Sequence, residues 1–190
     1  MSPLNPFTLS LLGALSLALS AHAHDHDHHH HEPNAAAHQH GIGELTIAID
    51  GQQLHLELTT PADDLLGFEH APQSTTEHAK IAALMTSLRQ PQNLFGLPEK
   101  AGCVLDGSDL HSPLFPVVEE PLPAEIAAEQ GHADIQAHYR YTCAHPEQLR
   151  YLEVKLFTGF PGTAELMVQA ITPNGQTGGE VTATANRINL

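Results

Sequence analysis

The sequence predicts an α+β domain made mainly of antiparallel β-sheet, sandwich-like or curled, with one main amphipathic helix. Segments between residues 43 and 188 alternate apolar and polar side chains, which is the period of half-buried strands. One segment, residues 74–89, instead repeats apolar side chains at helical spacing. The chain has 190 residues, of which 41% are hydrophobic, and this is enough for one core.

The first predicted element is a hairpin of residues 43–50 and 53–59. Its apolar positions alternate in both strands: Leu45, Ile47 and Ile49, then Leu54, Leu56 and Leu58. A turn at Asp50-Gly51 would pair Ile47 with Leu54 and Leu45 with Leu56. His55 and Glu57 would then lie on the wetter face as a solvated pair.

The next predicted elements are a loop and a helix. Residues 65–72 are expected to form a compact loop after Pro61 ends the second strand. Ser74 and Glu77 have the spacing of a capping box, which predicts a helix from there to about Arg89. Its apolar face would contain Ile81, Leu84, Met85 and Leu88, with Met85 as core packing and not a metal ligand.

The second half alternates again. Residues 102–105 are a short strand candidate, and residues 106–129, rich in Pro, Asp and Glu, are expected to be a long surface excursion that includes His111. Residues 132–143 are predicted to form a strand with Ile135, Tyr139, Tyr141 and Cys143 facing the core. Residues 151–157 and 164–171 are expected to pair as a hairpin, with a turn at 173–179 and a last strand at 181–188.

The N-terminal residues predict export. Residues 7–19 are apolar and are followed by Ala21-His22-Ala23, which is typical of a signal peptide of residues 1–23. The segment before them lacks Lys and Arg, so an uncleaved anchor is the alternative. In an oxidising compartment Cys103 and Cys143 would form a disulfide that stabilises the fold by about 4 kcal/mol. A thiolate metal site and two unpaired cysteines are the other interpretations.

Residues 24–40 contain half of the sixteen histidines of the chain. The run consists of His24, His26, His28, His29, His30, His31, His38 and His40, interleaved with Asp25, Asp27 and Glu32. Imidazole and carboxylate are common ligands of divalent metals, and so polar a segment cannot bury a core, which predicts a flexible collector of divalent metal ions such as Zn(II). Nickel and copper share these ligands, and an expression tag is the trivial alternative.

A fixed metal site in the globular domain, residues 41–190, is a second hypothesis. His132, Asp134 and His138 share one face of their predicted strand. His40, His70 with Glu69, and His111 are further candidates. A single histidine is more often solvated than a ligand, so only a group of these residues would make a site.

Charge and motifs exclude several classes of function. The formal charge of −15 disfavours nucleic acid and anionic lipid, and no segment is long enough for a stable membrane span. Hydrolase, nucleotide-binding and metalloprotease motifs are absent from the sequence, so we do not expect an enzyme. An interaction module whose His run only buffers metal is the alternative to a metal-capture protein.

Several motifs together resemble the ZrgA-like family of zinc-regulated proteins from the periplasm of Gram-negative bacteria. They are the His/Asp run, His40-Gly41-x-Gly-Glu-Leu, Gly67-Phe68-Glu69-His70-Ala71-Pro72, Tyr139-x-Tyr-x-Cys143, Leu156-Phe157 and Phe160-Pro161. The resemblance implies periplasmic zinc binding in support of zinc uptake, alongside an ABC-type importer or its binding protein. It does not identify the ligands of the folded domain.

Overall fold

The computed structural model describes residues 39–116 and 133–190. Contacts divide the chain into two units, Met1–Asn34 and Ala35–Leu190, and all described residues belong to the second. The expected signal peptide, the histidines of the run before His40, and His132 lie outside the described residues. The proposed domain boundaries therefore stay predictions.

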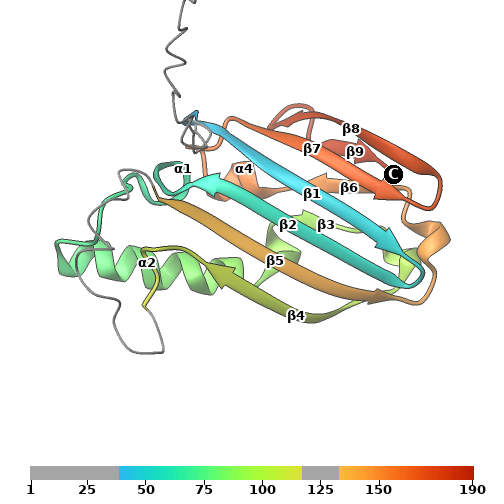
Figure 1. Ribbon diagram of the computed structural model, residues 1–190, viewed down its shortest axis with the longest axis horizontal. Helices are drawn as coiled ribbons and strands as arrows, with labels where there is room; N and C mark the ends of the chain where they lie inside the picture. The colour runs from blue at the N-terminus through green and yellow to red at the C-terminus, as the bar shows by residue number, and fades with distance from the viewer. Residues whose placement is uncertain (1–38, 117–132) are drawn as a thin grey trace, which may run out of the picture. The chain divides into compact units, whose positions relative to one another are not determined.

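A six-stranded sheet is the main element of the fold, in the order β4-β5-β2-β1-β7-β8 (Figure 1). Its strands are β1 (Ile42–Asp50), β2 (Gln53–Pro61), β4 (Cys103–His111), β5 (Asp134–Cys143), β7 (Glu165–Thr172) and β8 (Gly175–Thr182). All neighbouring pairs are antiparallel except β1 and β7, which run parallel. The predicted α+β class, dominated by antiparallel sheet, is confirmed.

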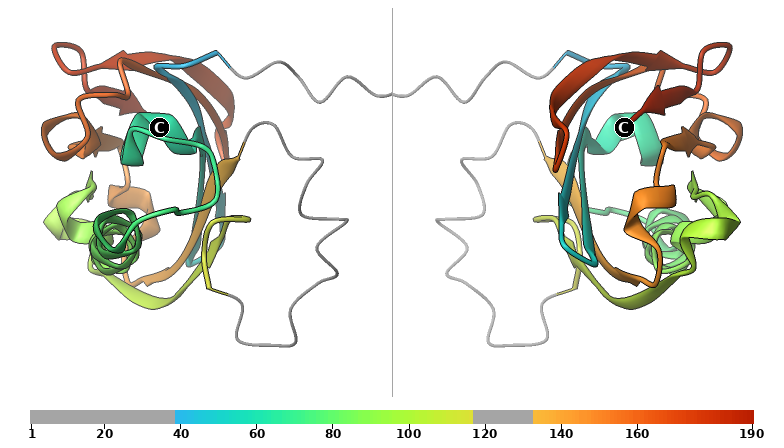
Figure 2. Two further views of the ribbon diagram at one scale, coloured as in Figure 1. Left: turned by 90° about the vertical axis from the view of Figure 1, so that its left-hand side faces the viewer. Right: turned by 90° about the vertical axis from the view of Figure 1, so that its right-hand side faces the viewer.

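The helices and a smaller sheet lie on one face of this sheet, and Figure 2 shows the two layers edge-on. The helices are α1 (Ala62–Leu66), α2 (Thr75–Leu88) and α4 (Leu156–Gly159), with 3₁₀ turns at Pro91–Asn93, Glu99–Ala101 and Pro146–Gln148. The smaller sheet has the order β3-β6-β9, formed by Phe95–Gly96, Tyr151–Val154 and Arg187–Asn189. We call this side the covered face; on the opposite, open face no described helix or strand packs.

The alternation of side-chain direction along each strand determines which side chains enter the core. Leu45, Ile47, Leu54 and Leu58 are completely buried, and the polar residues between them in β1 and β2 are exposed. Ile135, Tyr139, Tyr141 and Cys143 are buried as predicted. Because apolar burial is the main favourable term in folding, this alternation places the core between the sheet and the elements on its covered face.

Helix α2 forms as its sequence predicts. The Ser74 side chain accepts from the Glu77 amide, and the Glu77 carboxylate accepts from the Ser74 amide, which completes the capping box. The buried residues Ile81, Leu84 and Leu88 face the core, with Met85 partly buried beside them. The hydroxyl of Tyr139 on β5 donates to the Leu88 carbonyl at 2.9 Å and links the sheet to the end of this helix.

The register of the first hairpin differs from its prediction by two residues. Ile47 lies opposite Leu56 and Leu45 opposite Leu58, so the connecting residues are Gly51 and Gln52, with Gly51 at φ +56°. The predicted pairs were wrong, although the predicted faces were correct. A shift of two residues leaves every side chain on its face, so the apolar pattern cannot distinguish the two registers.

Three further predictions were wrong in the second half. Residues 106–111 continue β4 past an irregularity between Leu105 and Gly107, because pairing with β5 outweighs their polar composition. Segments 151–157 and 164–171 do not form a hairpin: β6 pairs with β3 and β9, α4 begins at Leu156, and β7 joins the large sheet beside β1. The glycine-rich residues 175–182 are a strand and not a turn, so the last strand divides into β8 and the short β9.

The predicted disulfide is present. Cys103 and Cys143 are bonded and occupy directly opposed positions in β4 and β5. The bond closes a separation of 40 residues, for which chain entropy gives about 4 kcal/mol of stabilisation. Among the described residues, no helix has the length and apolar character required to cross a membrane.

Candidate metal-binding site

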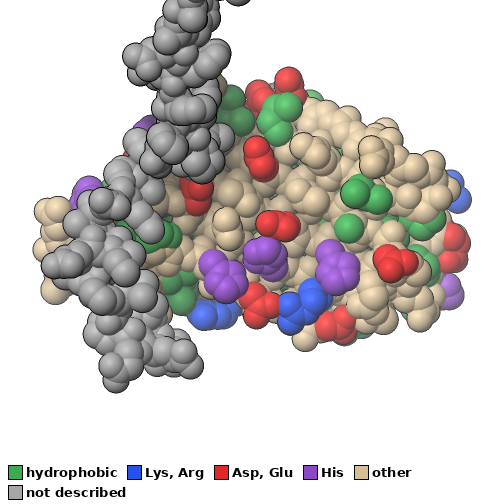
Figure 3. Space-filling view, in the orientation of Figure 1, with side chains coloured by type: hydrophobic (Ala, Val, Ile, Leu, Met, Phe, Trp, Pro, Cys, Tyr) green, Lys and Arg blue, Asp and Glu red, His purple; other side chains and the backbone are tan. Residues whose placement is uncertain are grey.

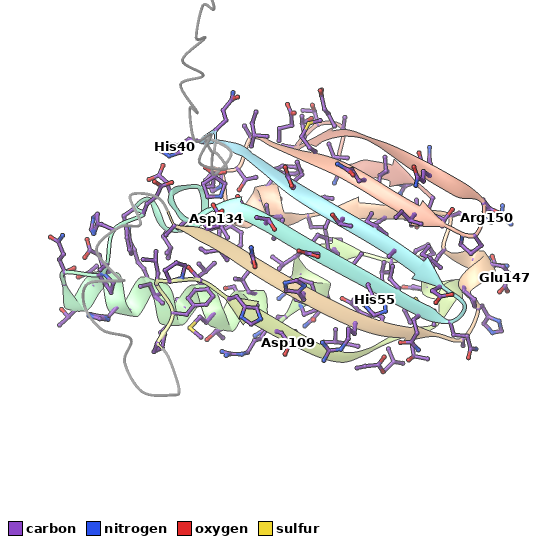
Figure 4. The ribbon with its side chains drawn as sticks, in the orientation of Figure 1. His40, His55, Asp109, Asp134, Glu147 and Arg150 are labelled. Carbon is purple, nitrogen blue, oxygen red and sulfur yellow. A yellow bond between two sulfur atoms is a disulfide. The ribbon has the colours of Figure 1, made fainter. Side chains whose placement is uncertain are left out.

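Imidazole and carboxylate groups gather at two places in the described structure. The His40 cluster, composed of His40, Asp63 and Glu69, lies where β1 begins. The sheet-face cluster, composed of Glu57, Asp109, His111 and His138, lies on the open face, where Figure 3 shows a row of histidine side chains with acidic groups around it. Figure 4 shows that His40 and Asp109 come from different parts of the fold.

In the His40 cluster one imidazole meets two carboxylates. His40 Nε2 lies 3.0 Å from Glu69 Oε1, and His40 Nδ1 lies 3.7 Å from Asp63 Oδ2. The His40 side chain is 54% exposed, whereas that of Glu69 is only 12% exposed. The last histidine of the run is therefore accessible to solvent and is also in contact with a carboxylate that the fold positions.

Two glycines shape this contact. Gly41, next to His40, has φ +84°, and its amide donates to Asp64 Oδ1 at 2.7 Å. Gly67, with φ +79°, ends α1 before Glu69. Both conformations favour glycine. Residues 62–66 are helical, so the prediction of a loop over residues 65–72 was wrong at its start. The loop begins only after Gly67.

Asp64 is a buried carboxylate behind this cluster. Its oxygens accept hydrogen bonds from the Gly41 amide and from the Thr60 hydroxyl at 3.2 Å. Burial nevertheless raises the pKa of Asp64 above its ordinary value, because desolvation of the charged form outweighs these hydrogen bonds. Asp64 therefore acts as a support for the backbone at Gly41, while Asp63 and Glu69 face the imidazole.

The register of the sheet assembles the sheet-face cluster. Asp109 of β4 lies opposite His138 of β5, and His138 lies opposite Glu57 of β2. Side chains opposed in this way have Cβ atoms about 4.5–5.5 Å apart. Glu57 Oε2 is 3.8 Å from His138 Nδ1, and the His111 and His138 rings meet edge to face with centroids 5.8 Å apart.

A basic residue borders this cluster. Arg140 donates to Asp109 Oδ2 in an exposed ion pair, which holds the pKa of Asp109 below its ordinary value. Thr46, His55, Glu57, His138 and Arg140 are among the residues around an adjoining hollow of about 210 Å³ on the open face. The cluster therefore combines carboxylates, imidazoles and solvent access.

The predicted residues of the folded domain are divided between these places. Asp134 and His138 share a face of β5 but lie four positions apart, about 13 Å at the rise of a strand, so one ion cannot bridge them without a rearrangement. Asp134 instead lies opposite Pro61, at the end of the sheet where His40 also lies (Figure 4). His70 stacks on the Phe68 ring, and its Nδ1 is 3.0 Å from the Ala71 carbonyl oxygen.

Sequence reasoning missed three acidic residues. The sequence does not single out Asp63, it predicts a loop at Asp109, and it predicts that Glu57 forms a solvated pair with His55. The alternation of buried and exposed positions is the signal that could have indicated this cluster. Glu57 in β2 and His138 in β5 both occupy positions that alternate with buried residues. Their proximity also depends on which strands are neighbours, and that is a property of the tertiary fold.

Neither cluster is a completed metal site. Among residues 39–116 and 133–190, no three His, Cys, Asp or Glu side chains already lie in an arrangement that could hold a metal ion. The structure provides pairs and rows of imidazole and carboxylate groups instead. Such groups can take part in binding if side chains rotate or if further ligands join them.

Comparison with known proteins relates this fold to metal uptake. A family model described as "ZrgA family zinc uptake protein" matches residues 37–190, which is most of the chain. No curated protein matches the chain. The matched region includes His40, Glu69 and the whole sheet-face cluster, but begins after the histidines from His24 to His31.

Proposed function

This chain belongs to the ZrgA family of zinc uptake proteins, and from that premise we propose that it captures Zn(II) in the periplasm and holds it for an uptake system. The histidine run of residues 24–40 would collect the ion, since it offers eight imidazoles and three carboxylates in seventeen residues. Redundant ligands of this kind favour rapid capture and exchange over one rigid site.

The contact between His40 and Glu69 is the observation that carries this proposal. The run ends at His40, whose Nε2 lies 3.0 Å from a mostly buried carboxylate of the folded domain. A carboxylate in contact with a ligating imidazole fixes its ring orientation and increases its basicity. An ion bound by the run would thus meet a positioned imidazole where the run joins the domain.

The remaining parts of the proposal follow from export and charge. We propose that residues 1–23 direct the chain to the periplasm and that an ABC-type importer or its binding protein accepts the ion. An acidic chain attracts cations, and exchangeable ligands allow release to an acceptor with a tighter site. The protein would carry out no catalysis, and its only ligand in this role would be the metal.

The test changes the ligands of the run without changing its length. In the run-silenced protein, His24, His26, His28, His29, His30, His31 and His38 are replaced by Gln. We expect calorimetric titration with Zn(II) to show the loss of most of the zinc capacity of the unaltered protein. In the matched control, Asp25→Asn, Asp27→Asn and Glu32→Gln, the imidazoles remain, so the number of bound ions should be retained with lower affinity.

Equal zinc number and equal affinity in the unaltered and run-silenced proteins would contradict capture by the run. Titration with Ni(II) and Cu(II) belongs in the same experiment, because the same ligands bind them and Cu(II) is intrinsically favoured. Transfer of bound zinc to a stronger chelator should also be measured. Faster transfer from the unaltered protein than from the run-silenced protein would support a role of the run in exchange.

A further inference from the structure

We propose that the open face of the sheet binds one Zn(II) ion through His111, His138 and Asp109, at a site separate from the histidine run. The identity of the metal rests on the proposed function, whereas the ligands are chosen from the described fold alone. Asp109 and His111 are alternate residues of β4, and His138 lies directly opposite Asp109 on β5. All three side chains therefore project from the same face of two bonded strands.

The spacing of the two imidazoles fits a shared ion. Zinc lies about 2.0–2.1 Å from an imidazole nitrogen, so two rings on one tetrahedral ion have centroids about 5 Å apart. The His111 and His138 centroids are 5.8 Å apart with planes at 81°. Rotation of exposed side chains can close this difference without movement of the strands.

Asp109 provides the third ligand. Asp109 lies directly opposite His138 in the sheet and two residues from His111 on β4, so its carboxylate projects beside both imidazoles. Arg140 donates to Oδ2, which leaves Oδ1 to approach the metal. The guanidinium would thus orient the carboxylate, as outer partners of metal ligands do.

Glu57 is the fourth part of the arrangement, as a positioning residue. Its Oε2 lies 3.8 Å from His138 Nδ1, on the β2 side and away from β4. That distance is too long for a hydrogen bond but short enough for a small ring rotation to make one. With Nδ1 directed to Glu57, Nε2 of His138 would be the nitrogen that binds the ion, and water would complete the tetrahedron.

Burial distinguishes this site from a structural zinc site. The side chains of Asp109 and His138 are 50% and 36% exposed, and the cluster lies beside a hollow on the open face. Structural zinc sites have four protein ligands, whereas three ligands and a water leave a position for exchange. Such a site can receive an ion from one donor and pass it to another.

The test uses the full-length run-silenced protein, so that the folded domain is measured without the excess ligands. We expect Zn(II) titration to show one equivalent that is lost, or weakened at least about tenfold, by His111→Gln and by His138→Gln. His145→Gln is the matched control, because His145 Nδ1 is 3.7 Å from Glu147 Oε1 but no described histidine ring stacks on it. This variant should bind as before.

A spectroscopic measurement identifies the geometry. Co(II) in place of zinc should give the intense visible absorption of a tetrahedral site in the run-silenced protein, and this should disappear in His138→Gln but not in His145→Gln. Glu57→Gln should weaken zinc binding on the order of tenfold without abolishing it. Circular dichroism of each metal-free variant checks that it is folded.

The proposed site would be overturned if both His111→Gln and His138→Gln still bound one full equivalent of Zn(II). Co(II) spectra of these two variants that match the spectrum of the control, His145→Gln, would also overturn it. This failure differs from failure of the proposed function. The sheet-face site is tested by variants of β4 and β5, whereas capture by the run is tested by comparing the run-silenced and unaltered proteins.

Discussion

The two faces of the six-stranded sheet use the same strands for different purposes. On β2, Leu54, Leu56 and Leu58 enter the core, and the alternate residues His55 and Glu57 are exposed on the open face. On β5, buried residues alternate in the same way with His138 and Arg140. Adjacent residues thus separate core packing from the exposed imidazole and carboxylate groups, because successive side chains of a strand point in opposite directions.

Two carboxylates show what the local environment does to one chemical group. Asp64, a buried residue of α1, has its pKa raised by desolvation. Asp109, exposed on the open face, has its pKa lowered by the hydrogen bond and charge of Arg140. Of the two, Asp109 is therefore the one that remains ionised over the wider pH range.

The largest expected difference between the faces is in stability. Leu56 belongs to the core and is only 1% exposed. Leu56→Ala should lower the free energy of unfolding by about 2–5 kcal/mol, because it removes apolar contacts and leaves a cavity in the core. His55→Gln, one residue away on the open face, should change it by less than about 0.5 kcal/mol. Urea denaturation of both proteins measures the difference, and similar losses would mean that the open face is also packed.

A smaller effect is expected from one buried hydrogen bond on β5. Tyr139→Phe removes the hydroxyl that donates to the Leu88 carbonyl and leaves that buried acceptor unpaired. We expect a loss of about 1–2 kcal/mol in the free energy of unfolding.

The comparison for Tyr139→Phe is Arg140→Gln, the next residue and on the opposite face. It removes the exposed ion pair with Asp109, so its effect should be much smaller and should vanish at high salt. Chemical denaturation at low and high ionic strength separates the two cases. A loss for Tyr139→Phe no larger than that for Arg140→Gln would show that the hydroxyl contributes little.

The smallest expected effect concerns Asp64 and has a characteristic sign. Because its pKa is raised in the folded state, the fold favours the protonated carboxyl, and stability contributed by this group is lost as pH rises through the raised pKa. Asp64→Asn keeps an acceptor for the Gly41 amide and removes the charge. Its stability at neutral pH should therefore equal or slightly exceed that of the unaltered protein.

Thermal unfolding between about pH 3 and about pH 7 tests this sign. The advantage of Asp64→Asn should grow as pH rises and disappear in acid. An advantage that grows in acid would mean that the carboxylate is stabilised in its charged form, as Asp109 is.

Much of the fold could be predicted because it depends on local periodicity. The faces of β1, β2 and β5 follow from alternation, and α2 follows from its capping box and helical spacing. The register of β1 and β2 could not be predicted, since a shift of two residues preserves both faces. The strand character of residues 106–111 and 175–182 depends on their partners β5 and β7, which stabilise sequences of low strand propensity.

The candidate sites likewise depend partly on residue types that are visible in the sequence and partly on contacts that only the tertiary fold makes. The sequence indicated His138, His111, His40 and Glu69 individually, because residue type is visible in it. It could not show that His40 meets Glu69, or that Asp109 lies opposite His138 while Asp134 lies four residues away at the start of β5. Those facts depend on which strands are neighbours and on where each one starts.

By itself the sequence determined the chemistry of this protein: an acidic, histidine-rich chain with strands of one apolar and one polar face, one capped helix and a pair of cysteines that could bond. The tertiary structure alone decided which ligands meet, because the order β4-β5-β2 brings residues 57, 109 and 138 into one row. Contacts between residues this far apart in the chain depend on strand pairing, which is settled by packing the whole core and not by any local pattern.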